Sequence, residues 1–265
     1  MRLLDYLLEH DLVPDERTGR GLIMRGDVLV DERPVTSAAA EVSLDSRVRV
    51  RGDQSGAVSR GVAKLAGVAK RLGFDCEGRI ALDLGVGSGG FTQVLLAAGA
   101  ARVYAVDVAY GMVAMGIRDD RRVVLLERTN ARKLTREQVP EPIERMVGDL
   151  SFISWAAVLP AVVPLLGPEA RLLLLVKPQF ELAARGRDDL VAGGVVRDAA
   201  AVEDCLTGLY NTWQAHALAP RAVVPAGVRG AKGNQEYFVL LERGETTIEA
   251  EYQAIVRQAL AEVTE

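Results

Sequence analysis

Four charged residues, spread widely along the chain, could together remove a proton from a hydroxyl group. They are two lysines and two acids, Lys64, Asp149, Lys177 and Glu236. A lysine can take a proton from an alcohol only if its pKa falls towards the working pH. Burial and a neighbouring ammonium lower that pKa, whereas nearby carboxylates raise it and hold the amine in place. The set could therefore activate a hydroxyl for attack, although each residue alone is more typical of a surface or capping ion pair.

A glycine-rich loop indicates a second chemical function, the binding of a nucleoside cofactor. The loop follows the apolar segment Ile80–Leu84 and contains Gly85, Gly87 and Gly89, and a helical pattern begins near Phe91. Glycines let the backbone approach a ligand closely, and the start of a helix offers free amide groups. The pattern of strand, glycine turn and helix therefore predicts a site for a nucleoside ligand.

Two carboxylates flank this loop. Asp83 lies two residues before the first glycine, where methyltransferases commonly keep an acid for the amino acid end of S-adenosylmethionine. Asp107 ends the next apolar segment, where it is placed to bind a ribose diol. The loop also fits a dinucleotide, since Gly85, Gly87 and Gly90 satisfy the G-x-G-x-x-G pattern. S-adenosylmethionine is the favoured cofactor, and a nicotinamide-dependent oxidoreductase stays open as an alternative.

A sheet is needed to bring these residues together. Short apolar segments alternate with helical patterns and predict an α/β fold whose mostly parallel sheet is covered on both faces. In such a sheet Asp149 and Lys177, which follow two strands, would face the cofactor from the carboxyl ends. The predicted strands are Ile80–Leu84, Val103–Val106, Val123–Leu126, Arg145–Val147, Leu172–Val176, Ala219–Val224 and Tyr237–Leu241. The predicted helices lie at about 60–72, 91–98, 110–117, 154–163, 199–214 and 249–263.

The beginning of the chain has a different pattern. Leucines recur at helical spacing, and short strands are predicted at Val28–Val30 and around Val48. A small, polar and glycine-rich stretch then predicts a linker. The expected division is a small α+β domain at 1–51, a linker at 52–57 and a large domain at 58–265.

Bulk composition excludes several classes of protein. The chain is 49% hydrophobic and 26% charged, has no apolar run long enough to cross a bilayer and no signal-peptide pattern. Cys76 and Cys205 lack metal or redox spacing, and His10 and His216 lie far apart, so we expect no metal site and a cytoplasmic protein. The net charge of −4 means that any contact with RNA must depend on local patches.

These motifs together resemble the TlyA family, hemolysin-named 2′-O-methyltransferases of ribosomal RNA. The resemblance covers nearly the whole chain, and the combination of motifs is more specific than the glycine loop alone. The matching segments are Val58–Gly61 with Lys64, Asp83 with Gly89–Thr92, Val103–Asp107, Glu127–Asn130, Asp149–Ser154, Val176–Glu181, Gly193–Asp198 and Lys232–Glu236.

The resemblance implies an FtsJ-like, Rossmann-like domain that uses S-adenosylmethionine. The two lysines and two acids introduced above would form its catalytic tetrad, with Lys177 nearest the attacking hydroxyl. Asp107 and Asn130 would contact the nucleoside of the cofactor, beside Asp83 and the loop glycines. No membrane partner is expected, because no strongly amphipathic basic segment supports the membrane lysis that the family's name suggests.

The resemblance also implies that residues 1–51 are an RNA-binding module of the kind found in ribosomal small-subunit protein four. Its RNA face would use Arg17, Arg20 and Arg25, which without the resemblance would be taken for a solvated helix face. The expected substrate is cytidine ribose in ribosomal RNA of the small or large subunit, and only RNA offers a 2′-hydroxyl. An RNA-binding or ribosome assembly protein with little catalysis is the alternative that the acidic net charge leaves open.

Overall fold

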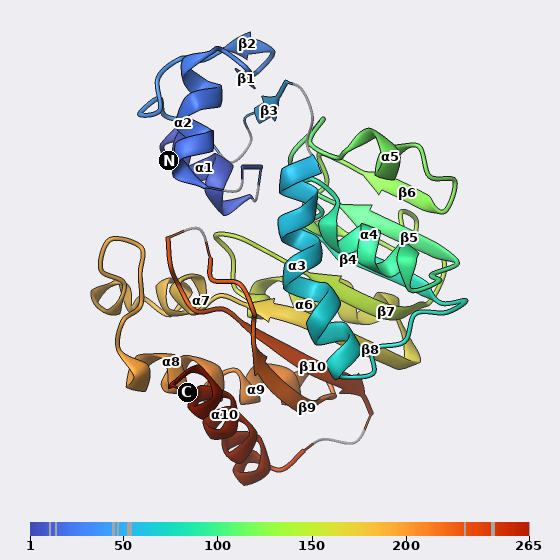
Figure 1. The fold of residues 1–265 in the computed structure, drawn as a ribbon. Helices are drawn as coiled ribbons and strands as arrows, with labels where there is room; N and C mark the ends of the chain where they lie inside the picture. The colour runs from blue at the N-terminus through green and yellow to red at the C-terminus, as the bar shows by residue number, and fades with distance from the viewer. Residues whose placement is uncertain are drawn as a thin grey trace.

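The computed structural model describes residues 1–10, 12–13, 15–43, 46, 48–51, 55–230, 232–244 and 247–264. A small N-terminal domain lies beside a large α/β domain (Figure 1). The small domain contains α1 (Leu3–Glu9), α2 (Glu16–Met24) and an antiparallel sheet of β1 (Val28–Val30), β2 (Arg33–Pro34) and β3 (Val48–Val50), in the order β2-β1-β3.

The two helices of the small domain pack unusually closely. A Cβ atom at Gly19 of α2 would lie 2.8 Å from Leu4 Cδ1 of α1, so a larger residue at this position would make the Leu4 side chain shift. Asp15 caps α2 by accepting a hydrogen bond from the Thr18 amide at 2.7 Å.

The large domain contains a seven-stranded sheet in the order β6-β5-β4-β7-β8-β10-β9. Strands β4 to β8 run parallel, and β10 runs antiparallel between β8 and β9. The prediction of a mostly parallel sheet is therefore confirmed. The strands are β4 (Ile80–Leu84), β5 (Arg102–Val106), β6 (Val123–Leu126), β7 (Ile143–Gly148), β8 (Leu166–Val176), β9 (Leu218–Pro225) and β10 (Tyr237–Arg243).

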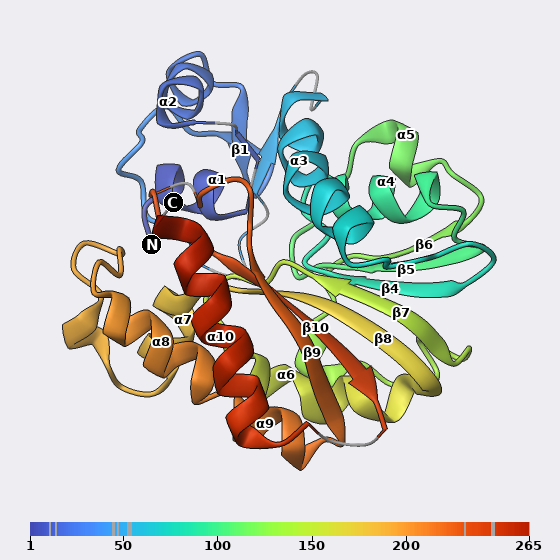
Figure 2. The same cartoon turned by 60° about the horizontal axis from the view of Figure 1, so that its bottom comes forward.

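Helices cover both faces of this sheet (Figures 1 and 2), because successive strand residues point to opposite sides. The helices are α3 (Ser55–Arg71), α4 (Gly90–Ala97), α5 (Met115–Arg118), α6 (Trp155–Val162), α7 (Pro178–Ala184), α8 (Ala199–Thr207), α9 (Tyr210–Ala215) and α10 (Glu249–Thr264). Leu82 and Leu84 belong to the core cluster under α6, α8, α9 and α10, whereas Ala81 belongs to the cluster under α3 and α4. Short 3-10 turns lie at Ala131–Lys133, Val163–Leu165 and Asp188–Leu190.

Several predicted boundaries differ from the structure. Residues 55–57 of the predicted linker belong to the first turn of α3, and its residues 52–54 lie outside the described residues. The helix predicted at 110–117 is reduced to α5, because Gly111 has a φ of 74° and its amide donates to Glu127 Oε1 at 2.6 Å. The helix predicted at 199–214 is interrupted at Gly208, where α8 ends.

The small domain contacts the large one at the carboxyl ends of the parallel strands. Ala109 and Met112, which follow β5, belong to the apolar core of the small domain. Lys232, which precedes β10, forms ion pairs with Asp5 and Glu9 of α1 at 3.7 and 3.8 Å. Among the described residues no helix has the length and apolar character needed to cross a bilayer.

Candidate active site

The glycine loop between β4 and α4 has a backbone course that only glycine adopts easily. Gly85, Gly87 and Gly89 have φ angles of 80°, 51° and 102°, in the left-handed region. A Cβ atom at Gly85 would also collide with the carbonyl oxygen of Asp149. Backbone conformation therefore favours glycine at all three positions, and at Gly85 the closeness of the loop after β7 favours it as well.

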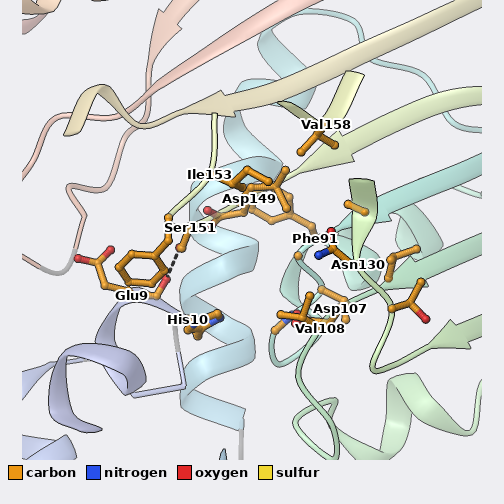
Figure 3. A pocket seen from close by; sticks show the side chains of 18 of the residues that line it. Glu9, His10, Phe91, Asp107, Val108, Asn130, Asp149, Ser151, Ile153 and Val158 are labelled. Carbon is orange, nitrogen blue, oxygen red and sulfur yellow. Dashed lines mark hydrogen bonds between the residues drawn. The ribbon is translucent and has the colours of Figure 1, made fainter. Parts of the chain in front are cut away.

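Asp107 and Asn130 border the same cavity as the glycine loop (Figure 3). The Asp107 carboxylate accepts hydrogen bonds from the amides of Gly87 and Ala109, each at 2.8 Å. Asn130 Oδ1 accepts from the Arg132 amide at 3.0 Å. Asp107 thus fixes the glycine loop to the end of β5, and Asn130 closes the neighbouring wall.

Asp83 lies beneath the glycine loop, outside the residues that line the cavity. Its side chain is fully buried, and its Oδ2 accepts from the Thr92 hydroxyl at 2.6 Å. Its Oδ1 has no hydrogen-bond partner among the described residues. Burial raises the pKa of Asp83 to about 7, the Thr92 hydroxyl opposes this rise, and the nearby charges of Asp149 and Asp107 add to it.

The cavity has a volume of about 370 Å³ and opens between the two domains. Most of its walls come from the glycine loop, the end of β5, the turn after β6 and the loop after β7. Glu9 and His10, at the C-terminal end of α1, complete the wall on the side of the small domain (Figure 3). A cavity of this size, mostly apolar with a few polar groups, is typical of a small-molecule site.

The structure brings the two lysines and two acids together beside this cavity. Lys177 Nζ lies 2.7 Å from Asp149 Oδ1, and Lys64 Nζ lies 3.1 Å from Asp149 Oδ2. Lys64 Nζ also lies 3.2 Å from Glu236 Oε2. All four side chains are largely buried, with exposed fractions of 1% to 11%. The resulting row alternates in charge: Lys177, Asp149, Lys64, Glu236.

The electrostatics of this row keep Asp149 ionised. Burial alone would raise the pKa of Asp149, but the ammonium groups of Lys177 and Lys64 hold it well below its usual range. These residues do not form surface ion pairs, which is what each of them would suggest alone, because their side chains are buried away from solvent.

Local backbone structure explains how Lys177 reaches this position. Pro178 disfavours helical geometry at the residue before it, and Lys177 has extended angles of φ −109° and ψ 102°. Pro178 then occupies the first turn of α7, a helix that the sequence analysis did not predict. On the facing loop, Phe152 has a φ of 63°, a strained conformation for a residue with a side chain.

The three arginines assigned to an RNA face lie on α2 and its C-terminal end, away from the cavity. All three are exposed. Arg20 pairs with Glu16 at 2.6 Å, and Arg25 pairs with Asp27 at 2.9 Å. The sequence analysis did not include these flanking acids as partners.

Neither cysteine lies among the residues that line the cavity. Cys76 and Cys205 are buried, and burial raises the pKa of their thiols to about 11 and about 12. Within the part of the chain that the structure describes, no cluster of His, Cys, Asp and Glu could hold a metal ion.

Comparisons with known proteins show the family of the chain. Residues 57–243 match the FtsJ-like methyltransferase family. The chain is 40% identical to the 16S/23S rRNA (cytidine-2′-O)-methyltransferase TlyA of Mycobacterium tuberculosis, over 89% of this chain and 87% of that protein. It is 33% identical to hemolysin A of Brachyspira hyodysenteriae, over 90% and 98%. A solved structure of a hemolysin-named protein from Streptococcus thermophilus superposes with a TM-score of 0.74 at 26% identity, covering 100% of this chain and 97% of that one.

Proposed function

Because the chain belongs to the TlyA family of FtsJ-like methyltransferases, we propose that it methylates the 2′-oxygen of a cytidine ribose in ribosomal RNA, with S-adenosylmethionine as the methyl donor. The observation that carries this proposal is the buried, alternating row of Lys177, Asp149, Lys64 and Glu236 beside the cavity. A nucleoside site alone would fit many reactions, whereas a buried lysine held by carboxylates suits the activation of a hydroxyl.

The residues around the glycine loop fit S-adenosylmethionine. Gly85, Gly87 and Gly90 line the cavity with backbone alone, and Asp107 stands at the end of β5, where a ribose diol would bind. Asp83 lies beneath the loop and outside the residues that line the cavity, so it would support the loop through Thr92 rather than face the cofactor. When bound, this cofactor supplies an activated methyl group on a positively charged sulfur.

The sheet topology argues against the nicotinamide-dependent alternative. The dinucleotide-binding fold has a mostly parallel sheet built from two βαβαβ halves. Here the last strand, β10, lies antiparallel between β8 and β9. The family match is to methyltransferases as well, so the glycine pattern that fits both cofactors is assigned to S-adenosylmethionine.

Lys177 is the proposed acceptor of the hydroxyl proton. When the 2′-oxygen takes the methyl group that the cofactor would supply, the proton of the hydroxyl would pass to Lys177 Nζ. Asp149 holds that amine in place from 2.7 Å. Lys64 contacts the same carboxylate, and its positive charge favours loss of the ammonium proton of Lys177 before the reaction. Lys177 is then a neutral amine that can accept the proton of the hydroxyl. Glu236 in turn holds Lys64.

We further propose that residues 1–51 form the RNA-binding module, with Arg17, Arg20 and Arg25 on its RNA face. All three guanidinium groups are exposed, and the ion pair of Arg20 with Glu16 is solvated on both sides. Exposed ion pairs contribute only about 0–1 kcal/mol, so a phosphate can replace the carboxylate at small cost. A positively charged surface of this kind would orient the RNA through its phosphates.

Methyl transfer to ribosomal subunits tests the proposal. Subunits from a strain that lacks the enzyme should accept labelled methyl groups from S-adenosylmethionine in the presence of the wild-type protein. Lys177→Ala should abolish transfer while calorimetry still detects binding of the cofactor. Lys70→Ala is the matched control, because Lys70 is an exposed lysine on α3. Transfer by Lys177→Ala at the wild-type rate would overturn the assignment of the proton acceptor.

A further inference from the structure

Ser151 lies between the proposed proton acceptor and the small domain. Lys177 Nζ donates a hydrogen bond to Ser151 Oγ at 2.9 Å. The Ser151 hydroxyl in turn donates to the main-chain carbonyl of Glu9, also at 2.9 Å (Figure 3). Two residues separated by 142 positions in the sequence are thereby joined at the active site.

The carbonyl of Glu9 determines which way this hydroxyl points. A carbonyl oxygen can only accept a hydrogen bond, so the single proton of Ser151 is directed towards Glu9. Ser151 Oγ can then only accept from Lys177. Without the carbonyl, the hydroxyl could rotate and donate its proton to a neutral Lys177, occupying the lone pair that must take up the proton of the substrate.

The two acceptors also orient the amine. A neutral lysine amine has two hydrogens and one lone pair in a tetrahedral arrangement. The nitrogen is held from two sides, because it donates to Ser151 Oγ and forms an ion pair with Asp149 Oδ1 at 2.7 Å. Ser151 lines the cavity, so its hydroxyl joins the amine of Lys177 to the place where substrate and cofactor would meet.

Contacts between the domains place the Glu9 carbonyl. Glu9 is the last residue of α1, and carbonyls in the last turn of a helix lack partners within the helix. Lys232 reaches Asp5 and Glu9 on this helix from the loop before β10. A Cβ atom added at Gly87 would lie 3.1 Å from His10 O, so the end of α1 packs against the glycine loop.

We propose that Ser151 is a positioning residue for Lys177, and that the Glu9 carbonyl of the docked small domain holds its hydroxyl in the accepting orientation. Methyl transfer at full rate therefore requires the small domain to be docked on the large one, in addition to any role of that domain in binding RNA. This inference rests on the proposed function, because it assigns a partner to the residue that would accept the proton.

Single-turnover methyl transfer with saturating cofactor and RNA tests the role of the hydroxyl. Loss of one hydrogen bond to a charged or reacting group corresponds to a rate lower by about 10-fold to 100-fold. Ser151→Ala should show this loss with nearly unchanged affinity for S-adenosylmethionine. Ser151→Thr keeps the hydroxyl and should restore most of the rate. A wild-type rate for Ser151→Ala, or a parallel loss of cofactor affinity, would overturn the positioning role.

Charge reversal at the domain contact tests the coupling. Lys232→Glu places a negative charge opposite Asp5 and Glu9, and should lower the rate in the wild-type background. Adding Asp5→Lys should restore part of it. In the Ser151→Ala background Lys232→Glu should have little further effect, because residues that act as a unit are not additive. Fully multiplicative losses would overturn the inference, whereas a wild-type protein that transfers no methyl group would overturn the proposed function itself.

Discussion

Replacing Asp149 with asparagine removes the negative charge that two buried lysines share. Lys177 and Lys64 have side chains that are only 3% and 1% exposed, and their amines lie 2.7 and 3.1 Å from the two carboxylate oxygens. Removing one partner of a buried ion pair typically costs about 3–5 kcal/mol, because the remaining charge is left uncompensated. Glu236 still pairs with Lys64 in the variant, so we expect the free energy of unfolding to fall by about 3 kcal/mol.

The size of this loss depends on pH. The folded-state pKa of Asp149 is lowered, so its contribution to stability is present above the ordinary carboxyl range and is lost as the pH falls through the folded value. In Asp149→Asn a lysine without its anion can instead lose its proton, and it does so more readily as the pH rises. The loss of stability should therefore be larger near about pH 6 than near about pH 9.

Urea unfolding of the wild type and the variant at both pH values measures this difference. Asp189→Asn is the control, because it removes the acid of an exposed ion pair with Arg187 and should cost no more than about 1 kcal/mol. A loss for Asp149→Asn as small as that of the control, or an equal loss at both pH values, would refute the view that Asp149 compensates two buried ammonium groups.

Three further predictions concern the cofactor loop and the RNA face. The folded-state pKa of Asp83 is raised to about 7, so the free energy of unfolding of the wild type should fall as the pH rises from about 4 to 7. In urea unfolding, Asp83→Asn should flatten this pH dependence and raise the free energy of unfolding by on the order of 4 kcal/mol at about pH 8. An unchanged pH profile would contradict the view that burial raises this pKa. Gly87→Ala, at a position with positive φ, should weaken the affinity for S-adenosylmethionine measured by calorimetry by about 1–2 kcal/mol. Gly67→Ala is the control, because open space surrounds Gly67 on α3, and it should leave the affinity unchanged. Equal affinities for the two variants would exclude the loop from the cofactor site. Arg17→Ala and Arg20→Ala should each reduce the salt dependence of RNA binding by about one phosphate contact, and unchanged slopes would place the RNA elsewhere.

The parallel sheet and the glycine loop could be predicted because their signals are local. Buried strands appear as short apolar segments, and a turn with positive φ requires glycine at fixed positions. The meeting of Lys64 with Asp149 and Glu236 is a long-range contact, and it followed from the family resemblance together with the rule that strand ends share one edge. Periodicity alone could not have placed Lys64 there, because a lysine on an amphipathic helix is usually exposed.

The position of the Asp83 side chain relative to the cavity could not be predicted from the spacing of the glycine loop. Side chains alternate along a strand, so Asp83 shares the face of Ala81, which packs under α3 and α4. Its carboxylate therefore meets Thr92 at the beginning of α4, beneath the loop rather than on the wall of the cavity. The sequence identified an acid before the glycines, but its spacing does not distinguish a residue under the loop from one facing the ligand.

The contribution of the small domain to the cavity had no signal in the sequence. Glu9 and His10 end a helix whose leucines indicated only an apolar core. Their position depends on how two domains dock, through contacts that join residues more than a hundred positions apart. Helix α7 was missed for a different reason, since Pro178 ends the extended strand and also begins a helix.

The position of the methyl group on the RNA tests the central claim most directly. Ribosomal RNA treated with the protein and S-adenosylmethionine would be digested to nucleosides and analysed by mass spectrometry. The account predicts 2′-O-methylcytidine with the wild-type protein and none with Lys177→Ala. Methylation on a base, or the same yield of 2′-O-methylcytidine from Lys177→Ala, would contradict it.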